Sequence, residues 1–79
     1  MADNNEIGKA WAAGKAAHAA NFSTDGNDIY SYQLKIGHTY GGKKIAIDYT
    51  KSGGQYFSQT TSKHVSIAKR NADKVIPPK

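Results

Sequence analysis

The sequence of 79 residues contains no cysteine, and this absence excludes two kinds of stabilising link. Without thiols there is no disulfide and no thiolate metal site, so the small core alone must hold the fold. No run of about 18 apolar residues occurs, so no segment is predicted to span a membrane. The first residues are acidic and polar, which argues against an export signal. We expect one cytoplasmic domain spanning residues 1–79, with flexible ends at 1–5 and 76–79.

Acidic residues are scarce in the second half of the chain, which carries a net charge of +6 against −1 for the first half. Residues 1–42 hold three lysines and four acids, whereas residues 43–79 hold seven lysines, Arg70 and two acids. Net charge bears on association rather than on fold. The asymmetry favours an anionic partner, with nucleic acid first, although many small proteins are this basic for solubility alone.

The N-terminal part of the chain predicts a helix from Ile7 to about Ala20, because it is rich in alanine, the best helix former. Trp11 and Gly14 share its apolar stripe. Gly14 on that stripe indicates that another backbone passes close by. Four further alanines form a smooth second face, which predicts either a solvent-exposed surface or a homodimer interface: Ala12, Ala13, Ala16 and Ala20.

Two segments alternate between apolar and polar residues and predict paired strands. Residues 29–36 and 44–50 have the period of two that is typical of half-buried strands. Turn residues 23–27 precede the first strand, and the loop 37–42 joins the two. A short third strand is predicted at 55–58. The residues expected to face the core are Tyr30, Tyr32, Leu34, Ile36, Ile45, Ile47 and Tyr49.

The stretch from Ile45 to Ala68 leads into a second predicted helix, which would run to about Val75. Candidate N-caps occupy positions 60–62, and prolines at 77 and 78 end the helix. The order α-β-β-β-α gives an α+β fold class: a small single domain with a three-stranded antiparallel β-sheet packed with an N-terminal and a C-terminal helix. The inward face of the second helix is expected to hold His64, Val65, Ala68, Ala72 and Val75.

Short motifs along this order resemble a group of small uncharacterised bacteriophage proteins. The strings STDGNDIYSYQLKIG, DYT and FSQTTSKHVSIA carry the resemblance, together with AW and GKAA in the first helix. It covers roughly residues 10–73. The resemblance implies a phage-encoded, single-domain protein acting in the cytoplasm of the host cell, and it implies no activity. Small phage proteins of this kind often act on host machinery, including defence complexes.

Few residues are candidates for catalysis or for binding a metal. His18, His38 and His64 lack a metal-binding spacing, and no cofactor is expected. We interpret His64 as a structural residue that bonds a backbone carbonyl or Asp48, with a ligand contact as the alternative. Asp48 has no second carboxylate nearby and suits a surface salt bridge. We expect that the protein is not an enzyme, and a hydrolase is the weakest of the alternatives. Structural roles are also predicted for Thr60, Thr61, Ser62, Trp11 and Gly14.

The strongest functional signal is a basic patch in the second half. Lys63, Arg70 and Lys74 fall in one sector of the predicted helix, with Ile67 at its edge. The five tyrosines add surfaces on which bases can stack. The first hypothesis is that this patch binds nucleic acid or a host nucleoprotein complex. The alternatives are an inhibitor of a host defence complex, in the manner of an anti-CRISPR protein, and a structural homo-oligomer. Three more lysines would extend the patch if they lie nearby: Lys43, Lys44 and Lys51.

Overall fold

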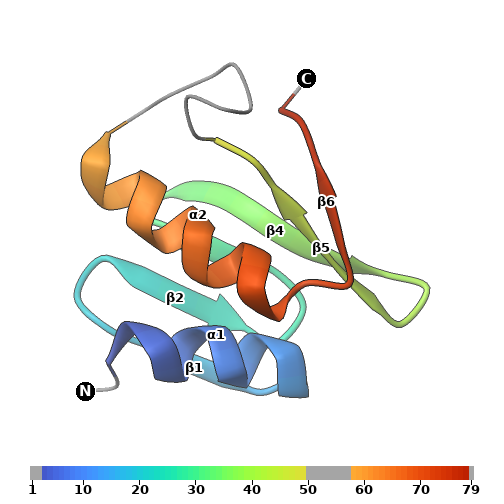
Figure 1. The fold of residues 1–79 in the computed structure, drawn as a ribbon. Coiled ribbons are helices and arrows are strands. Elements are labelled where there is room, and N and C mark those ends of the chain that lie inside the picture. Colours follow the sequence, from blue (N-terminus) through green and yellow to red (C-terminus); the bar gives the residue numbers. More distant parts are fainter. Residues whose placement is uncertain (1–2, 50–57, 79) are drawn as a thin grey trace.

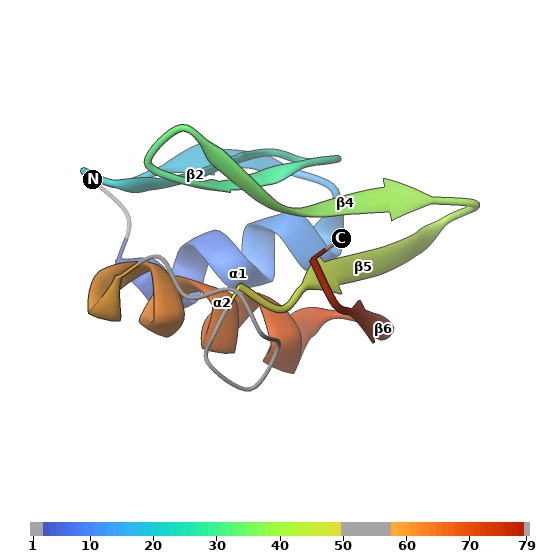
Figure 2. The same cartoon turned by 90° about the horizontal axis from the view of Figure 1, so that it is seen from above.

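Two helices pack against one face of a six-stranded sheet in the computed structural model, which describes residues 3–49 and 58–78 (Figures 1 and 2). The strands neighbour one another in chain order, and every pair is antiparallel except β5 with β6. An α+β chain with a helix near each end is confirmed, but the three-stranded sheet is wrong. The elements are α1 (Asn4–Ala13), β1 (Ala16–His18), β2 (Phe22–Asp25), β3 (Ile29–Ser31), β4 (Leu34–Tyr40), β5 (Lys43–Ile47), α2 (Gln59–Asn71) and β6 (Lys74–Ile76).

Helix α1 begins with a capping box and is shorter than predicted. The Asp3 side chain accepts a hydrogen bond from the Glu6 backbone, and the Glu6 side chain accepts one from the Asp3 backbone. The helix ends at Gly14, whose φ of 75° lies in the left-handed region that stops helices. The prediction of a helix to Ala20 is wrong, because pairing of β1 with β2 overrides the helix propensity of alanine.

Because α1 ends early, two further predictions about the first helix change, one for Gly14 and one for the four alanines. A Cβ on Gly14 would meet nothing within 4 Å, so Gly14 is not packed on an apolar stripe. Another backbone does pass close to Gly14, as predicted: a Cβ on Gly26 would lie 2.7 Å from the Gly14 carbonyl oxygen. Ala16 lies in β1 and Ala20 in the turn after it, so the four alanines share no helix face. The alanine face expected to carry a homodimer interface therefore does not exist, and the homodimer itself stays a prediction.

The predicted strand 29–36 is in fact a hairpin. Tyr32 adopts a φ of 58° and lies in the turn between β3 and β4, where its side chain is 52% exposed. Ile29 and Ser31 face the core in place of Tyr30 and Tyr32. Most of the predicted loop 37–42 belongs to β4, and only its last two glycines form the turn to β5, both with positive φ.

The faces of β5 are reversed relative to the prediction. Lys44 and Ala46 are buried, whereas Ile45 and Ile47 are half-buried. The Lys44 side chain faces inward because its ammonium donates to the Gly26 carbonyl at 2.6 Å and to the Thr39 hydroxyl at 2.8 Å. The predicted third strand lies outside the described residues, apart from Ser58.

Helix α2 starts earlier and ends earlier than predicted. Ser58 is the N-cap and accepts a hydrogen bond from the Thr61 backbone, so positions 60–62 form the first turn rather than the cap. The helix ends at Asn71, and the chain extends into β6, which pairs in parallel with β5. Val75 therefore lies in a strand and is 43% exposed, not packed on a helix face.

The core lies between the helices and the sheet. Trp11 is fully buried, as predicted, and its indole N–H donates to the Asn27 carbonyl at 2.9 Å. Residues 3–5 and Ile76, predicted to be flexible, belong to the cap, α1 and β6. The buried apolar side chains are Ile7, Trp11, Phe22, Ile29, Ile36, Ala46, Val65, Ile67 and Ala68.

Candidate functional site

The outer face of the sheet is not covered by either helix, since α1 and α2 both lie against the other face (Figure 2). Side chains alternate along a strand, so burial identifies the outward residues. Phe22 and Thr24 are buried in β2, which turns Ser23 and Asp25 outward. Tyr30 faces outward from β3 by the same reasoning.

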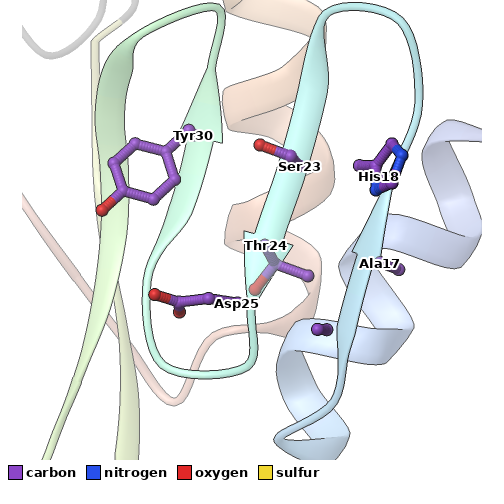
Figure 3. Close-up of a pocket in the computed structure, with 7 residues that line it drawn as sticks. Ala17, His18, Ser23, Thr24, Asp25 and Tyr30 are labelled. Atoms are coloured by element: carbon purple, nitrogen blue, oxygen red, sulfur yellow. The ribbon is translucent and has the colours of Figure 1, made fainter.

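Four outward side chains form a row across neighbouring strands. Ser23 is the register partner of His18 on one side and of Tyr30 on the other. Lys35 is in turn the partner of Tyr30 on β4. Register partners lie on the same face of a sheet with their Cβ atoms about 4.5–5.5 Å apart. Figure 3 shows Tyr30, Ser23 and His18 side by side on this face.

A shallow hollow of about 600 Å³ lies over β1, β2 and β3. Its floor is made of small side chains, with the Tyr30 ring at one side and His18 at the other (Figure 3). A surface of this shape suits a flat ligand lying on the sheet rather than a buried substrate. The lining residues are Ala16, Ala17, His18, Ser23, Thr24, Asp25 and Tyr30.

The ring of Tyr30 is held in place by its hydroxyl. That hydroxyl donates to Oδ2 of Asp28 at 3.2 Å, and the same oxygen lies 3.3 Å from the Lys35 ammonium. Partial burial and the Asp28 carboxylate raise the pKa of Tyr30, so the phenol stays protonated at neutral pH. Figure 3 shows the ring broadside, with one face turned away from the sheet.

Asp25 supplies a negative charge at the end of the hollow. Its Oδ1 accepts hydrogen bonds from the backbone N–H groups of Asn27 at 2.9 Å and Asp28 at 2.8 Å. These two bonds lower the pKa of Asp25, so the carboxylate is charged at neutral pH. The side chain extends toward the hydroxyl end of the Tyr30 ring (Figure 3). An exposed, charged acceptor therefore lies beside a half-buried ring that turns one face outward.

The outer face continues onto β4, β5 and β6 with further rings and cations. Tyr40 pairs with Lys43, and Tyr40 is 76% exposed. His38 pairs with Ile45, which pairs with Lys74 at the edge of the sheet. Two exposed lysines thus stand beyond the rings, at the far side from the hollow.

The described residues of the predicted basic patch are divided between the helix layer and the sheet. Lys63 and Arg70 are exposed on α2, in the helix layer, where Arg70 lies 3.5 Å from the Asn5 side chain. Lys43 and Lys74 belong to the sheet instead. Ile67 was expected at an exposed edge, but it is buried against α1, where a Cβ on Gly8 would meet it at 2.7 Å.

Two lysines of the predicted patch need separate mention. Lys44 is 8% exposed and bonded to neutral groups inside the fold, so it is not available to a partner. Its ammonium also lies 5.7 Å from the centre of the Trp11 ring. Lys51 lies outside the described residues.

Contacts within the fold are made by three residues that were expected to have structural roles: His64, Thr61 and Asp48. His64 is buried, and its Nδ1 lies 2.7 Å from the Ser31 hydroxyl, not against Asp48 or a backbone carbonyl. Thr61 is buried in the same cluster, 3.2 Å from Ser31. Asp48 pairs with Lys69 at 3.5 Å. Ser31, Thr61 and His64 are each less than 5% exposed, and His64 also lines a second hollow beside the start of α1.

Sequence reasoning missed the hollow because it placed Tyr30 in the core and residues 16–20 in a helix. One usable signal was present. Asp25-Gly26-Asn27 favours a tight turn between strands, and reading it as a hairpin would have put Phe22 inward and Ser23 outward. The other wall, β1, had no such signal, because an alanine run predicts helix.

Comparison of the chain with protein-family models, with curated proteins and with solved structures finds no significant match. The resemblance to a bacteriophage group therefore stays a prediction. Within residues 3–49 and 58–78, no cluster of three or more histidine or acidic side chains has the arrangement to hold a metal ion. No helix in that part of the chain is long and apolar enough to cross a bilayer.

Proposed function

We propose that this chain is a non-enzymatic nucleic-acid-binding protein that holds a single strand on the open face of its sheet. The observation that carries the proposal is the combination of outward-facing rings, of which Tyr40 is exposed and Tyr30 and His38 are half-buried, with exposed cations on that face. Tyr30, His38 and Tyr40 lie outward on strands β3 and β4. Lys43 and Lys74 border them.

Exposed rings on a sheet suit unpaired bases. Single-stranded nucleic acid is commonly bound by stacking its bases on aromatic side chains of a sheet, while cations follow the backbone. Such stacking stabilises binding by about 1–3 kcal/mol per base and tolerates many sequences. A base-paired duplex hides its base faces, so the sheet face should prefer single strands.

The acidic side chains are bonded within the fold, whereas several lysine and arginine side chains are exposed at the surface. Each of the six acidic residues takes part in a hydrogen bond or ion pair within the fold. Among residues 3–49 and 58–78, the ion pairs with these acids are Lys35 with Asp28 and Lys69 with Asp48. Within the described part of the chain, six cations have no carboxylate within 4 Å and can neutralise phosphates: Lys9, Lys15, Lys43, Lys63, Arg70 and Lys74.

Fluorescence anisotropy with labelled 12-nucleotide strands, measured from 50 to 300 mM salt, tests the proposal. Two double variants each remove two exposed cations: Lys43→Gln with Lys74→Gln on the sheet, and Lys63→Gln with Arg70→Gln on α2. The sheet variant should weaken binding more and lower the slope of log affinity against log salt by about 1.4, since each phosphate contact on a single strand contributes about 0.7.

Comparing the two double variants shows whether nucleic acid binds to the sheet or to the helices. A larger loss from the α2 variant would place nucleic acid on the helices, as the sequence alone indicated, and would contradict the sheet face. Absence of binding to any strand at 50 mM salt would overturn the proposal altogether.

The second candidate function is inhibition of a host defence complex by protein–protein contact. Exposed apolar surface at Tyr32 and Val75 favours it, since such groups anchor protein partners. Binding of this kind should persist in 300 mM salt and should not require nucleic acid. Pull-down from a bacterial lysate with and without nuclease distinguishes the two, because only the inhibitor would retain a stoichiometric protein complex after nuclease treatment.

A further inference from the structure

We infer that the hollow over β1, β2 and β3 is a subsite for one base that carries an exocyclic amino group, such as cytosine. This inference rests on the proposed function and specifies one position within it. The base would lie flat on the outward face of Tyr30, with its amino group directed at Asp25. Both side chains line the same hollow.

The first argument is that Tyr30 is already oriented for stacking. Its hydroxyl is fixed to Asp28, which is itself held by Lys35, so the ring loses little freedom when a ligand arrives. The exposed ring face points away from the sheet (Figure 3). A planar ligand can therefore stack without any rearrangement of the strands.

The second argument is the space beside the ring. Ser23 is the register partner of Tyr30, and Ala16 is the partner of Asp25. These side chains are small, and the hollow above them holds about 600 Å³. A base that extends beyond the edge of the Tyr30 ring meets no bulky side chain until His18 (Figure 3).

The third argument is the chemistry of the Asp25 carboxylate. An ionised carboxylate is an acceptor only. The two backbone N–H groups bind Oδ1, and hydrogen bonds to this side chain keep it charged. Cytosine offers an N4 amino donor, whereas uracil and thymine present the O4 carbonyl at the same place. The carboxylate attracts the first and repels the second.

Cytosine and uracil have the same ring size, so comparing them isolates the contact at the base edge. The probes are labelled eight-nucleotide strands of deoxycytidine and of deoxyuridine, measured by anisotropy at pH 7.5 and 50 mM salt. We expect the deoxycytidine strand to bind about fivefold more tightly or better, the size of one charge-assisted contact at a solvent-exposed site.

Asp25→Asn tests the direction of the hydrogen bond. The asparagine oxygen can still accept from the Asn27 and Asp28 backbones, so the turn is retained, while the carboxylate becomes an amide that also donates. The preference should fall to equality or reverse toward deoxyuridine. A preference unchanged by this substitution would overturn the role of Asp25.

Tyr30 variants test stacking separately from the base edge. Tyr30→Leu should weaken both strands about tenfold, as expected for loss of one stacked base. Tyr30→Phe keeps the ring and should retain most of the affinity. Tyr32→Asn is the matched control: it removes an exposed tyrosine from the turn between β3 and β4, where asparagine tolerates a φ of 58°. Circular dichroism confirms that each variant is folded.

The outcomes separate this inference from the function it rests on. If the wild-type protein binds neither strand, the proposed function is overturned. If it binds both strands equally, and Tyr30→Leu binds as well as Tyr32→Asn, no base stacks in the hollow, so the subsite is overturned while nucleic-acid binding itself is retained. A cytosine preference that disappears in Asp25→Asn, with affinity that falls in Tyr30→Leu, supports the subsite.

Discussion

The imidazole of His64 and the hydroxyl of Ser31 form a buried hydrogen bond of 2.7 Å between Nδ1 and Oγ, joining α2 to β3. The same imidazole stacks on Phe22, with ring centres 4.3 Å apart and planes 1° from parallel. One side chain therefore connects the second helix to two strands of the sheet. These are the strands that carry Ser23 and Tyr30 on their outer face.

The burial of His64 predicts that the protein loses stability in mild acid. Burial lowers the pKa of His64 below its ordinary value of 6.5, because the charged form is disfavoured there. The unfolded chain then binds the proton more readily than the folded one. The free energy of unfolding should have its highest value above pH 6.5. It should decrease as the pH falls from 6.5 toward the pKa of His64 in the folded protein.

Urea denaturation at pH 7.5, 6.5 and 5.5, followed by circular dichroism, measures this effect. His64→Phe keeps a ring to stack on Phe22 and removes the titrating group, so its stability should be nearly flat over this range. His18→Gln, which alters an exposed histidine, should retain the wild-type decline. A wild-type protein equally stable at all three pH values would contradict the account of His64.

The contact between the helices predicts that Gly8→Ala destabilises the protein. A Cβ at position 8 would lie 2.6 Å from Asn71 Nδ2 and 2.7 Å from Ile67 Cγ2. Overpacking of this kind costs about 1–3 kcal/mol. Helix propensity alone predicts the opposite, a gain of roughly 1 kcal/mol.

Urea denaturation of Gly8→Ala therefore distinguishes packing from propensity by the sign of the change. Lys9→Ala, at an exposed position of the same helix, should lie within about 0.5 kcal/mol of the wild type. A Gly8→Ala variant more stable than the wild type by about 1 kcal/mol, the gain expected from helix propensity alone, would show that α1 and α2 are not in close contact at this point.

The buried Lys44 ammonium predicts a second stability effect. Lys44→Met preserves the length of the side chain but leaves the Gly26 carbonyl and Thr39 hydroxyl without their donor. An unsatisfied buried group costs about 1–3 kcal/mol. Lys43→Met, at the exposed neighbouring position, should change stability by less than about 0.5 kcal/mol. Thermal denaturation of both variants compares them, and equal stability would contradict the inward orientation of Lys44.

The sequence predicted those parts of the fold that local chemistry determines. The second helix was recognised because hydroxyl residues precede an amphipathic pattern, and His64, Val65 and Ala68 face the core as expected. An antiparallel partner for residues 44–50 was also expected, but the residues that pair with β5, 37–40, were placed in the loop between the two strands. These features depend on capping and turn preferences, which act over a few residues.

The remaining parts depend on contacts between distant residues. Tyr32 turns the chain without glycine, so an alternating pattern that suggests one strand forms two. Lys44 faces inward because the Gly26 carbonyl and the Thr39 hydroxyl accept hydrogen bonds from its ammonium. Residues 16–18 become a strand because β2 is beside them. The candidate site is built from these elements, which is why it could not be located from local patterns.

Chemical-shift mapping tests the central claim most directly. Titration of the ¹⁵N-labelled protein with an unlabelled eight-nucleotide deoxycytidine strand at low salt reports on every backbone amide. We predict that the largest shifts fall in β1 to β5, centred on Ser23 and Tyr30, with α1 and α2 little changed. Shifts confined to the helices around Lys63 and Arg70, or no shifts at millimolar strand, would contradict binding on the open face of the sheet.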